Sequence, residues 1–434
     1  MRGSFRVLAA ALLITLCACA RTPAPPSDTA PEGPGSLLPR STPWTTTWAS
    51  ASQPPLPGKA EKIANAQPIR LIVRTSVGGE RVRVRFSNLY GNREIHINAA
   101  HIALRSRGPD IDPATERDLT FITAPTAIVL PGHELTSDAV DFALPAFADL
   151  AITFWLTGEH EASTTHVLAQ QTSYVGALQG DTGTAFKATR TLDSWPFLAS
   201  VDVQMLGSTT VAVFGDSTVD GDGSTADANR RWPDFLARRF NSDGARVGVA
   251  NLGLIGNRLL RDSPAQSSDF GDTLGRAGID RFESDLERLP QVRCVILRIG
   301  VNDLGFPGTF APNDPPVTVA DLIDGFRRIA ATAHAKGVRV IGTTIAPFEG
   351  TAIEGFYNAA KEKVRTEVNA WMRSARDFDG VIDADAILRD PAQPTKLLAA
   401  FDSGDHLHAG DAGNERLAAE TPMDICPRPA VVHG

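Results

Sequence analysis

The expected secondary structure changes type in the middle of the chain, at about Gly207. Before this point, short runs with β propensity follow one another between Gly, Pro, Asp and Asn residues, and no convincing helix interrupts them. After it, short apolar runs alternate with segments of helical length and periodicity. Because 434 residues are also too many for one ordinary domain, the sequence predicts two folded domains of different class.

The first folded domain is expected over residues 44–205. Its predicted strands are 69–77, 81–89, 94–104, 127–130, 140–144 and 151–156. Many short strands separated by turn residues favour a β-sandwich. Residues 78–80, between the first two strands, are typical of a hairpin turn. Arg81, Arg83 and Arg85 alternate with apolar residues along the second strand, so we expect them on a solvated face.

The second domain is expected over residues 206–426 and reads as α/β. Its predicted strands are 209–214, 247–251, 292–299, 338–344 and 381–382, and its predicted helices are 232–240, 279–289, 319–335, 357–376 and 412–419. Strands that alternate with helices of this length predict a parallel sheet with helices on both faces. In such a sheet, chemistry collects at the carboxyl ends of the strands.

The first twenty residues are typical of a signal peptide. Two arginines precede an uncharged, mostly apolar run over residues 7–16, which is shorter than the ~20 residues that span a bilayer. Cleavage after Ala20 is one processing route. The other is lipidation of Cys19, because residues 16–19 resemble a bacterial lipobox, although Cys17 is unusual there. We expect export, as a periplasmic or outer-membrane lipoprotein rather than a freely secreted protein.

Residues 21–43 contain seven prolines among Ser, Thr, Gly and Ala, which indicates an extended tether. A tether directly after a lipid on Cys19 would hold the folded domains clear of a membrane surface. Apart from a lipidated Cys19, only Cys294 and Cys426 remain after processing. Cys294 lies in an apolar run, which favours a buried free thiol, while a disulfide between the two cysteines stays open.

Charge and motifs exclude several classes of partner. A protein that binds nucleic acid needs a basic face, so the net charge of −8 and the pI near 5.6 argue against a nucleic-acid partner. The sequence has no HExxH, paired CxxC or GxxxxGK motif. We therefore expect no metal and no cofactor.

A serine after a predicted strand and a histidine in a polar segment before a predicted helix suit nucleophilic catalysis. Ser217 stands on a tight turn after the first strand of the second domain. Near the other end, Asp405 precedes His408 by three residues, so its carboxylate can fix the tautomer of that imidazole within one loop. His406 is only one residue from Asp405 and is expected to point elsewhere.

Two further loops offer hydrogen-bond donors without charge. Gly256 follows the second strand and Asn302 follows the third. A glycine lets its backbone N–H approach closely, and an asparagine amide donates without carrying charge. Both suit an oxyanion hole, in which each donor contributes roughly 3 kcal/mol in the transition state.

Taken together, these four segments resemble the SGNH hydrolases, also called the GDSL esterase and lipase family. The match covers about residues 209–421, half of the chain. The family's four named residue types correspond in order to Ser217, Gly256, Asn302 and His408, and the aspartate of its DxxH block corresponds to Asp405. Two positions depart from the commonest pattern, Thr218 in place of Leu and Ala409 in place of Pro. Neither departure removes a reacting group.

The resemblance implies a three-layer α/β/α, flavodoxin-like domain that hydrolyses acyl esters through an acyl-enzyme. It implies a triad of Ser217, His408 and Asp405, with an oxyanion hole formed by the backbone N–H groups of Ser217 and Gly256 and the side chain of Asn302. The first half is similar to the N-terminal β domain of a bacterial branch of this family, a weaker match that rests on strand pattern and residues 85–88.

Two alternatives stay open at the level of the sequence. An acyltransferase that passes the acyl group to a sugar hydroxyl would use the same residues. A non-catalytic surface protein would bind glycan through its β domain and carry a degenerate second domain, which the five intact site positions argue against. The expected substrate is a small-molecule or polysaccharide ester, with acetyl or other short acyl groups favoured and aryl and lipid esters also compatible.

Overall fold

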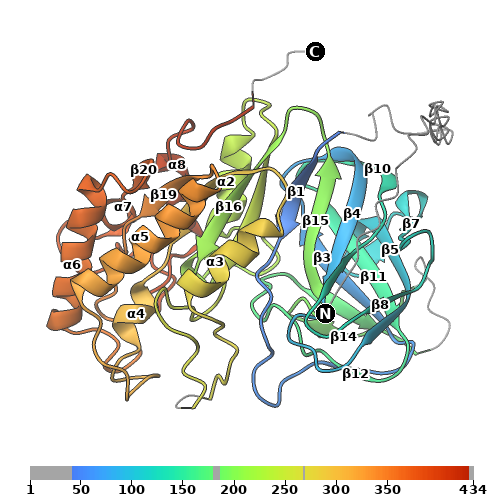
Figure 1. Ribbon diagram of the computed structural model, residues 1–434, viewed down its shortest axis with the longest axis horizontal. Coiled ribbons are helices and arrows are strands. Elements are labelled where there is room, and N and C mark those ends of the chain that lie inside the picture. Colours follow the sequence, from blue (N-terminus) through green and yellow to red (C-terminus); the bar gives the residue numbers. More distant parts are fainter. Residues whose placement is uncertain (1–41, 179–185, 267–268, 430–434) are drawn as a thin grey trace, which may run out of the picture. The chain divides into compact units, whose positions relative to one another are not determined.

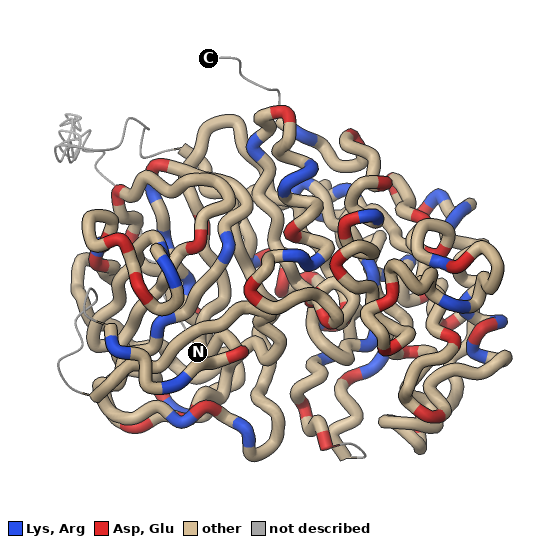
Figure 2. Tube along the Cα trace, turned by 180° about the vertical axis from the view of Figure 1, so that it is seen from behind, with Lys and Arg blue, Asp and Glu red and all other residues tan. Residues whose placement is uncertain are grey.

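A computed structural model describes residues 42–178, 186–266 and 269–429 (Figure 1). The predicted signal peptide, Cys19 and the tether up to residue 41 lie outside the described residues. Among the described residues, no helix combines the length and the apolar character needed to cross a membrane. Acidic and basic residues are interspersed along the trace in the view of Figure 2.

The first part of the described chain is built from strands. They are β1 (Trp44–Ala49), β2 (Lys62–Ile63), β3 (Pro68–Arg74), β4 (Gly79–Ser87), β5 (Ile95–Arg107), β6 (Asp110–Ile111), β7 (Arg117–Asp118), β8 (Ala127–Val129), β9 (Glu134–Thr136), β10 (Val140–Leu144), β11 (Asp149–Leu156), β12 (His160–Glu161), β13 (Ser173–Gly176), β14 (Ala188–Leu192) and β15 (Leu198–Gln204), with one 3-10 turn, η1 (Pro113–Thr115). One large sheet has the order β1-β15-β4-β10, with β9 beside β4, and the other large sheet has the order β14-β13-β3-β11-β5-β6, with β7 and β8 beside β5, while β12 and β2 form a separate pair.

Both sheets share one hydrophobic core. Val84 and Phe86 of β4 and Ile152 and Phe154 of β11 belong to the same buried cluster, although their strands lie in different sheets. Side chains that alternate along each strand therefore fill the space between two sheets, as in a sandwich. The expected β-rich first domain is confirmed.

The predicted hairpin around residues 78–80 is wrong. β3 pairs with β11 and β13, whereas β4 pairs with β15, β10 and β9, so the turn carries the chain from one sheet to the other. A Cβ atom on Gly78 would lie 2.4 Å from the carbonyl oxygen of Leu144. This glycine therefore permits a close approach between distant backbone segments, which a local turn motif does not reveal.

The arginines of β4 are also less exposed than predicted. The exposed fractions of the side chains of Arg81, Arg83 and Arg85 are 17%, 24% and 16%. Each pairs with an acid on a neighbouring strand; for example, Arg83 lies 2.9 Å from the buried Asp202 of β15. The stripe is a row of half-buried ion pairs across the sheet, not a solvated face.

The second part alternates strands and helices. Its strands are β16 (Thr209–Gly215), β17 (Val247–Gly253), β18 (Val292–Arg298), β19 (Arg339–Thr343) and β20 (Gly380–Ile382). Its helices are α1 (Ser217–Asp220), α2 (Trp232–Phe240), α3 (Gly278–Glu287), α4 (Val301–Gly305), α5 (Val319–Ala335), α6 (Ala359–Ser374), α7 (Ala384–Leu388) and α8 (Asp411–Glu420). The sheet is parallel throughout and has the order β17-β16-β18-β19-β20, which is the flavodoxin-like order.

Helices cover both faces of this sheet (Figure 1). Val211 and Val213 of β16 share a buried cluster with residues of α2, α7 and α8. Ala212 and Phe214, which point the opposite way, share another with residues of α3, α5 and α6. Successive residues of a strand alternate between faces, so an all-apolar strand such as β16 must be covered on both sides. The predicted three-layer α/β/α fold is confirmed.

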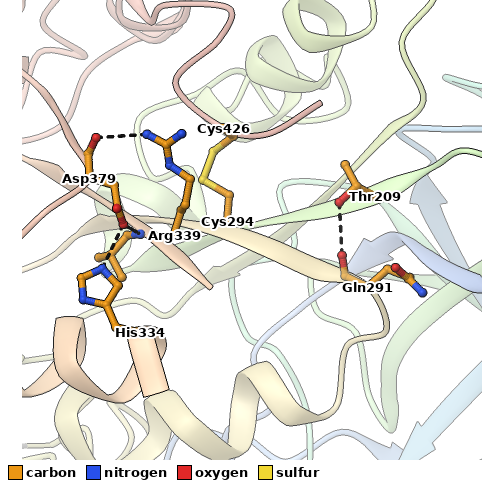
Figure 3. The surroundings of a disulfide bond; sticks show 8 residues. Thr209, Gln291, Cys294, His334, Arg339, Asp379 and Cys426 are labelled. Atoms are coloured by element: carbon orange, nitrogen blue, oxygen red, sulfur yellow. Dashed lines mark hydrogen bonds and ion pairs between the residues drawn. A yellow bond between two sulfur atoms is a disulfide. The ribbon is translucent and has the colours of Figure 1, made fainter. Parts of the chain in front are cut away.

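Cys294 and Cys426 form a disulfide, so the free-thiol interpretation of Cys294 is wrong (Figure 3). The bond ties β18 to the segment after α8, with a Cα–Cα distance of 5.6 Å. It spans a sequence separation of 132 residues, and closing so long a loop in the unfolded chain stabilises the fold by roughly 4–5 kcal/mol in the chain-entropy model. The apolar run around Cys294 correctly indicated that this residue is buried, but it could not show which cysteine pairs with it.

Strand β1 lies against β17, the edge strand of the parallel sheet. The backbone N–H of Thr46 in β1 donates to Thr210 Oγ1 in β16 at 3.1 Å. The N–H of Val249 in β17 donates to Ser76 Oγ at 2.9 Å, and a Cβ on Gly248 would lie 2.0 Å from the carbonyl oxygen of Thr46. Backbone groups of the two parts are therefore in direct contact along this edge. The exact domain limits at residues 43, 205 and 426 stay a prediction.

Candidate active site

The loops that carry the predicted site residues leave three adjacent strands at one edge of the parallel sheet. The carboxyl end of β16 is in register with the ends of β17 and β18. Ser217, Gly256 and Asn302 follow these three ends within a few residues. The strand order reverses at β16, and such a switch point forms a crevice for ligands in parallel α/β sheets.

Ser217 is the first residue of α1, directly after a tight turn. Asp216 caps the helix by accepting the backbone N–H of Thr218 at 2.9 Å. A Cβ on Gly215 would lie 2.0 Å from the carbonyl oxygen of Arg298, so only glycine allows this turn to sit against β18. The turn therefore places Ser217 at a helix N-terminus, where backbone N–H groups favour negative charge.

Ser217, His408 and Asp405 are in direct contact. Ser217 Oγ lies 2.8 Å from His408 Nε2, and His408 Nδ1 lies 2.5 Å from Asp405 Oδ2. The second Asp405 oxygen accepts the backbone N–H groups of Leu407 and His408 at 2.9 and 2.8 Å. The carboxylate accepts from Nδ1 and so leaves Nε2 of a neutral imidazole free to accept the serine proton.

His406 points away from this contact, as its place beside Asp405 predicted. Its Nδ1 binds Asp402, and its side chain is 53% exposed. Its backbone φ of 60° lies in the left-handed region, which turns the chain between Asp405 and His408.

Three carboxylates set the protonation of His408. Burial lowers its pKa, but Asp405, Asp222 and Asp216 raise it, so that the net pKa is above the ordinary value. Asp222 Oδ2 lies 3.8 Å from His408 Nε2, on the side that faces Ser217. The pKa of Asp405 is held far below its usual range: burial raises it, and the contacts with His408 more than compensate. The site therefore favours a carboxylate beside an imidazole that protonates readily.

The loops of Gly256 and Asn302 bind each other. Gly256 has a φ of 69°, and a Cβ there would lie 2.6 Å from the Leu274 side chain. Asn302 is buried within α4, where a loop was predicted, and its Nδ2 donates to the carbonyl oxygen of Asn257 at 3.0 Å. Because an amide nitrogen carries two hydrogens, this bond orients the Asn302 side chain and leaves one hydrogen to offer elsewhere.

Asp303 holds the same loop and was not singled out from the sequence. Its carboxylate accepts the backbone N–H groups of Leu259 and Leu260 at 2.6 and 2.9 Å. It is fully buried, and burial raises its pKa to about 6. An aspartate directly after Asn302 was visible in the sequence, but its partners lie more than forty residues away.

Arg298 is a second residue that the sequence did not reveal. It is buried at the end of β18, and its Nη1 donates to the carbonyl oxygen of Thr218 at 3.0 Å. Burial lowers its pKa to about 10, so it remains a cation at neutral pH. It thereby fixes the backbone next to Ser217 and balances the buried Asp216.

A parallel α/β sheet with a serine, a histidine and an aspartate in contact at its carboxyl edge is the arrangement of an α/β hydrolytic enzyme. Residues 211–421 match the model of the family described as GDSL-like Lipase/Acylhydrolase, and over these residues the chain belongs to that family. It is therefore a carboxylic ester hydrolase, as the resemblance predicted.

Solved structures of esterases are similar to about half of the chain. They include the carbohydrate acetylesterase Est24 from Sinorhizobium meliloti (17% identity, 48% of this chain and 94% of that chain, TM-score 0.36). The aryl esterase of M. smegmatis (19%, 49% and 95%, 0.37) and a GDSL-like lipase from Bacteroides thetaiotaomicron (15%, 50% and 87%, 0.35) are also similar. None of the curated proteins matches the sequence significantly.

Proposed function

We propose that the chain is a serine esterase in which Ser217, His408 and Asp405 act as the triad. The contact of Ser217 Oγ with His408 Nε2 at 2.8 Å carries this proposal. His408 takes the serine proton as Oγ attacks the ester carbonyl, and it then protonates the departing alcohol. Water repeats the cycle on the acyl-enzyme. Asp405 orients the imidazole and stabilises the imidazolium that forms.

The oxyanion is proposed to bind the backbone N–H groups of Ser217 and Gly256 and the side chain of Asn302. All three follow adjacent strand ends, and the bond from Asn302 to Asn257 supports a fixed direction for the remaining amide hydrogen. Donors that are held before the reaction cost no reorganisation when charge develops on the oxygen.

We further propose that the acyl group is acetyl or another short chain. A cavity of about 20 Å³ is lined by Thr218, Val301 and Leu407, the chain neighbours of Ser217, Asn302 and His408, but none of those three residues lines it. The short acyl chain is therefore tested directly, by the dependence of activity on chain length. Carbohydrate esters such as acetylated xylan are proposed substrates alongside simple aryl esters.

The test is a Ser217→Ala variant assayed on p-nitrophenyl esters of increasing chain length. We expect a fall in kcat of at least ~1,000-fold on the acetyl ester, with the melting temperature retained. In the wild type, kcat/KM should decline as the acyl chain lengthens. Ordinary turnover by folded Ser217→Ala would refute the triad, and a preference for long chains would refute the acyl assignment.

Product analysis separates hydrolysis from acyl transfer. The wild type is incubated with p-nitrophenyl acetate and acetylated xylan, with and without an excess of a sugar acceptor. Hydrolysis predicts free acetate in both arms. Acetylated acceptor as the main product would instead identify a transferase that uses the same residues.

We also propose that the protein is exported and that Cys19 is lipidated. The apolar run of residues 7–16 supports export, as does the Cys294–Cys426 disulfide, because such bonds persist in oxidising compartments. The test is the N-terminal mass of protein produced in a Gram-negative host, compared with a Cys19→Ser variant. An unmodified start at Arg21, with membrane partition unaltered by Cys19→Ser, would overturn the lipidation.

A further inference from the structure

A buried histidine of the β-rich part binds the helix that carries Ser217. His166 Nε2 lies 2.8 Å from Asp220 Oδ1, and Asp220 is the last residue of α1. The exposed fractions of the two residues are 2% and 0%. Water is therefore excluded from the contact, which joins residues 54 positions apart in the sequence.

The surroundings of His166 define where its protons are. Its Nδ1 lies 2.9 Å from the carbonyl oxygen of Ala51, which only accepts, so Nδ1 must carry a hydrogen. Its Nε2 faces a carboxylate, so a second hydrogen lies between the ring and Asp220. Burial lowers the pKa of His166, but the interaction with Asp220 raises it by more than burial lowers it. The net pKa is therefore above the ordinary value. The pair thus shares one proton across the buried contact and carries no net charge.

The second oxygen of Asp220 reaches the Gly256 loop. Asp220 Oδ2 accepts the backbone N–H of Ile255 at 2.9 Å. Ile255 directly precedes Gly256, whose N–H is a proposed oxyanion donor. A continuous series of hydrogen bonds therefore runs from Ala51 through His166 and Asp220 to this loop.

The residues after His166 bind the loop that follows α1. Gln170 Nε2 donates to the carbonyl oxygen of Gly221 at 3.2 Å, and the backbone N–H of Thr172 donates to Asp227 Oδ1 at 2.6 Å. Asp222, which lies beside His408, belongs to the same loop. Residues 166–172 therefore support both sides of the proposed site, the Gly256 loop and the Asp222 loop.

We propose that His166 and Asp220 are positioning residues, through which the β-rich part holds the Gly256 loop in the geometry that binds the oxyanion. This inference rests on the proposed function. When His166 holds the Asp220 side chain, Oδ2 accepts the Ile255 N–H in one fixed direction. The position of the next backbone N–H, that of Gly256, is thereby fixed as well. Without the His166 contact, Asp220 is free to turn, and the donor is no longer held where charge develops.

A matched pair of amide substitutions tests the contact. In His166→Gln the side-chain nitrogen stands in for Nε2 and can still donate to Asp220. In His166→Asn it stands in for Nδ1, binds Ala51 and does not reach Asp220. We expect His166→Asn to lower kcat on p-nitrophenyl acetate at least tenfold with KM within threefold, and His166→Gln to restore kcat to within threefold of the wild type.

The control is Thr210→Val, which removes another buried hydrogen bond between the two parts, together with the bond from Thr210 Oγ1 to the carbonyl oxygen of Pro290. Thr210 Oγ1 accepts the N–H of Thr46 at the amino end of β16, away from Ser217. All variants are assayed below their melting temperatures. We expect Thr210→Val to lower the melting temperature but to retain kcat. Equal kcat in His166→Asn and His166→Gln, or an equal loss in Thr210→Val, would overturn the proposal.

Hydrogen exchange of the peptide that contains Ile255 and Gly256 gives a readout independent of activity. Its amides should exchange faster in His166→Asn than in the wild type, and at the wild-type rate in His166→Gln and Thr210→Val. If the wild type fails to hydrolyse any ester, the proposed function fails, yet the exchange still decides whether His166 holds the loop. Unchanged exchange in His166→Asn would overturn the inference.

Discussion

Asp405 binds His408 twice, through the ring Nδ1 at 2.5 Å and through the backbone N–H at 2.8 Å. Both contacts lie within a single four-residue segment, so the orientation of the imidazole relative to its carboxylate is set locally. Only the Ser217 contact must then be supplied by the rest of the fold, across 191 sequence positions. The relation between histidine and aspartate is therefore readable from the sequence, while the relation to serine depends on the sheet.

His408→Ala should abolish ester hydrolysis, whereas His406→Ala should change kcat less than threefold. His408 contacts Ser217, while His406 binds Asp402 near the surface. Steady-state kinetics on p-nitrophenyl acetate measure both, and His406→Ala serves as the control. If His406→Ala were the inactive variant, the proposed triad would be wrong.

Asp222→Asn should move the acidic limb of the kcat/KM profile to lower pH. His408 must be neutral to accept the serine proton, so activity falls as pH drops through its pKa. The Asp222 charge raises that pKa, and its removal lowers it, so the variant should stay active in more acidic buffer than the wild type. The profile is measured between pH 4 and 9. If the acidic limb of the profile lies at the same pH in Asp222→Asn and in the wild type, Asp222 does not act on His408.

Asn302→Ala should lower kcat by about 100-fold or more and leave KM nearly unchanged. Its amide is proposed to bind the oxygen only when that oxygen becomes charged, which affects the transition state more than the bound substrate. Initial rates over a range of ester concentrations separate the two constants. A rise in KM alone would make Asn302 a substrate-binding residue.

Asp303→Asn should become more stable relative to the wild type as pH rises from about 4 to 7. Burial raises the pKa of Asp303 to about 6, above the ordinary 3.8, so the folded chain binds more protons than the unfolded chain in this range. Stability conferred by the protonated form is then lost with rising pH, by about 3 kcal/mol in total. Urea unfolding at several pH values measures the difference. A constant difference would contradict the raised pKa.

Removing the disulfide should lower the free energy of unfolding by about 2–5 kcal/mol with little change in kcat. Cys294 lies in β18, the strand before the helix α4 that carries Asn302, so the bond supports the sheet and touches no residue of the proposed triad. Urea denaturation of a Cys294→Ser, Cys426→Ser double variant measures the loss. A large fall in kcat in the folded variant would show that the bond acts on the site.

Features that depend on nearby residues were predictable. The helices at 232–240 and 319–335 were predicted at their observed limits, because each has a clear start and an apolar face. The hairpin expected at residues 78–80 does not form. The path of the chain at Gly78 depends on a backbone contact with Leu144, which is distant in the sequence. Local turn propensity cannot report which of two sheets receives the next strand.

The candidate site divides in the same way. Ser217 could be named from its place after the first strand of the second domain, and His408 from the aspartate three residues before it. The bond between His166 and Asp220 could not, since neither residue has an unusual local sequence and the two meet only when both parts are folded. Buried charges that support a site are set by tertiary contacts, which residue order alone does not specify.

The contact of β1 with β17 has a consequence for how the two halves can be separated. β17 is the last strand of its sheet on that side, and a bare edge of this kind recruits strands from other molecules. Val249, whose N–H binds Ser76, would present an unpaired donor if the first half were removed. A fragment that begins near residue 206 should therefore aggregate through this edge. By covering the edge of β17, the β-rich half also prevents polymerisation.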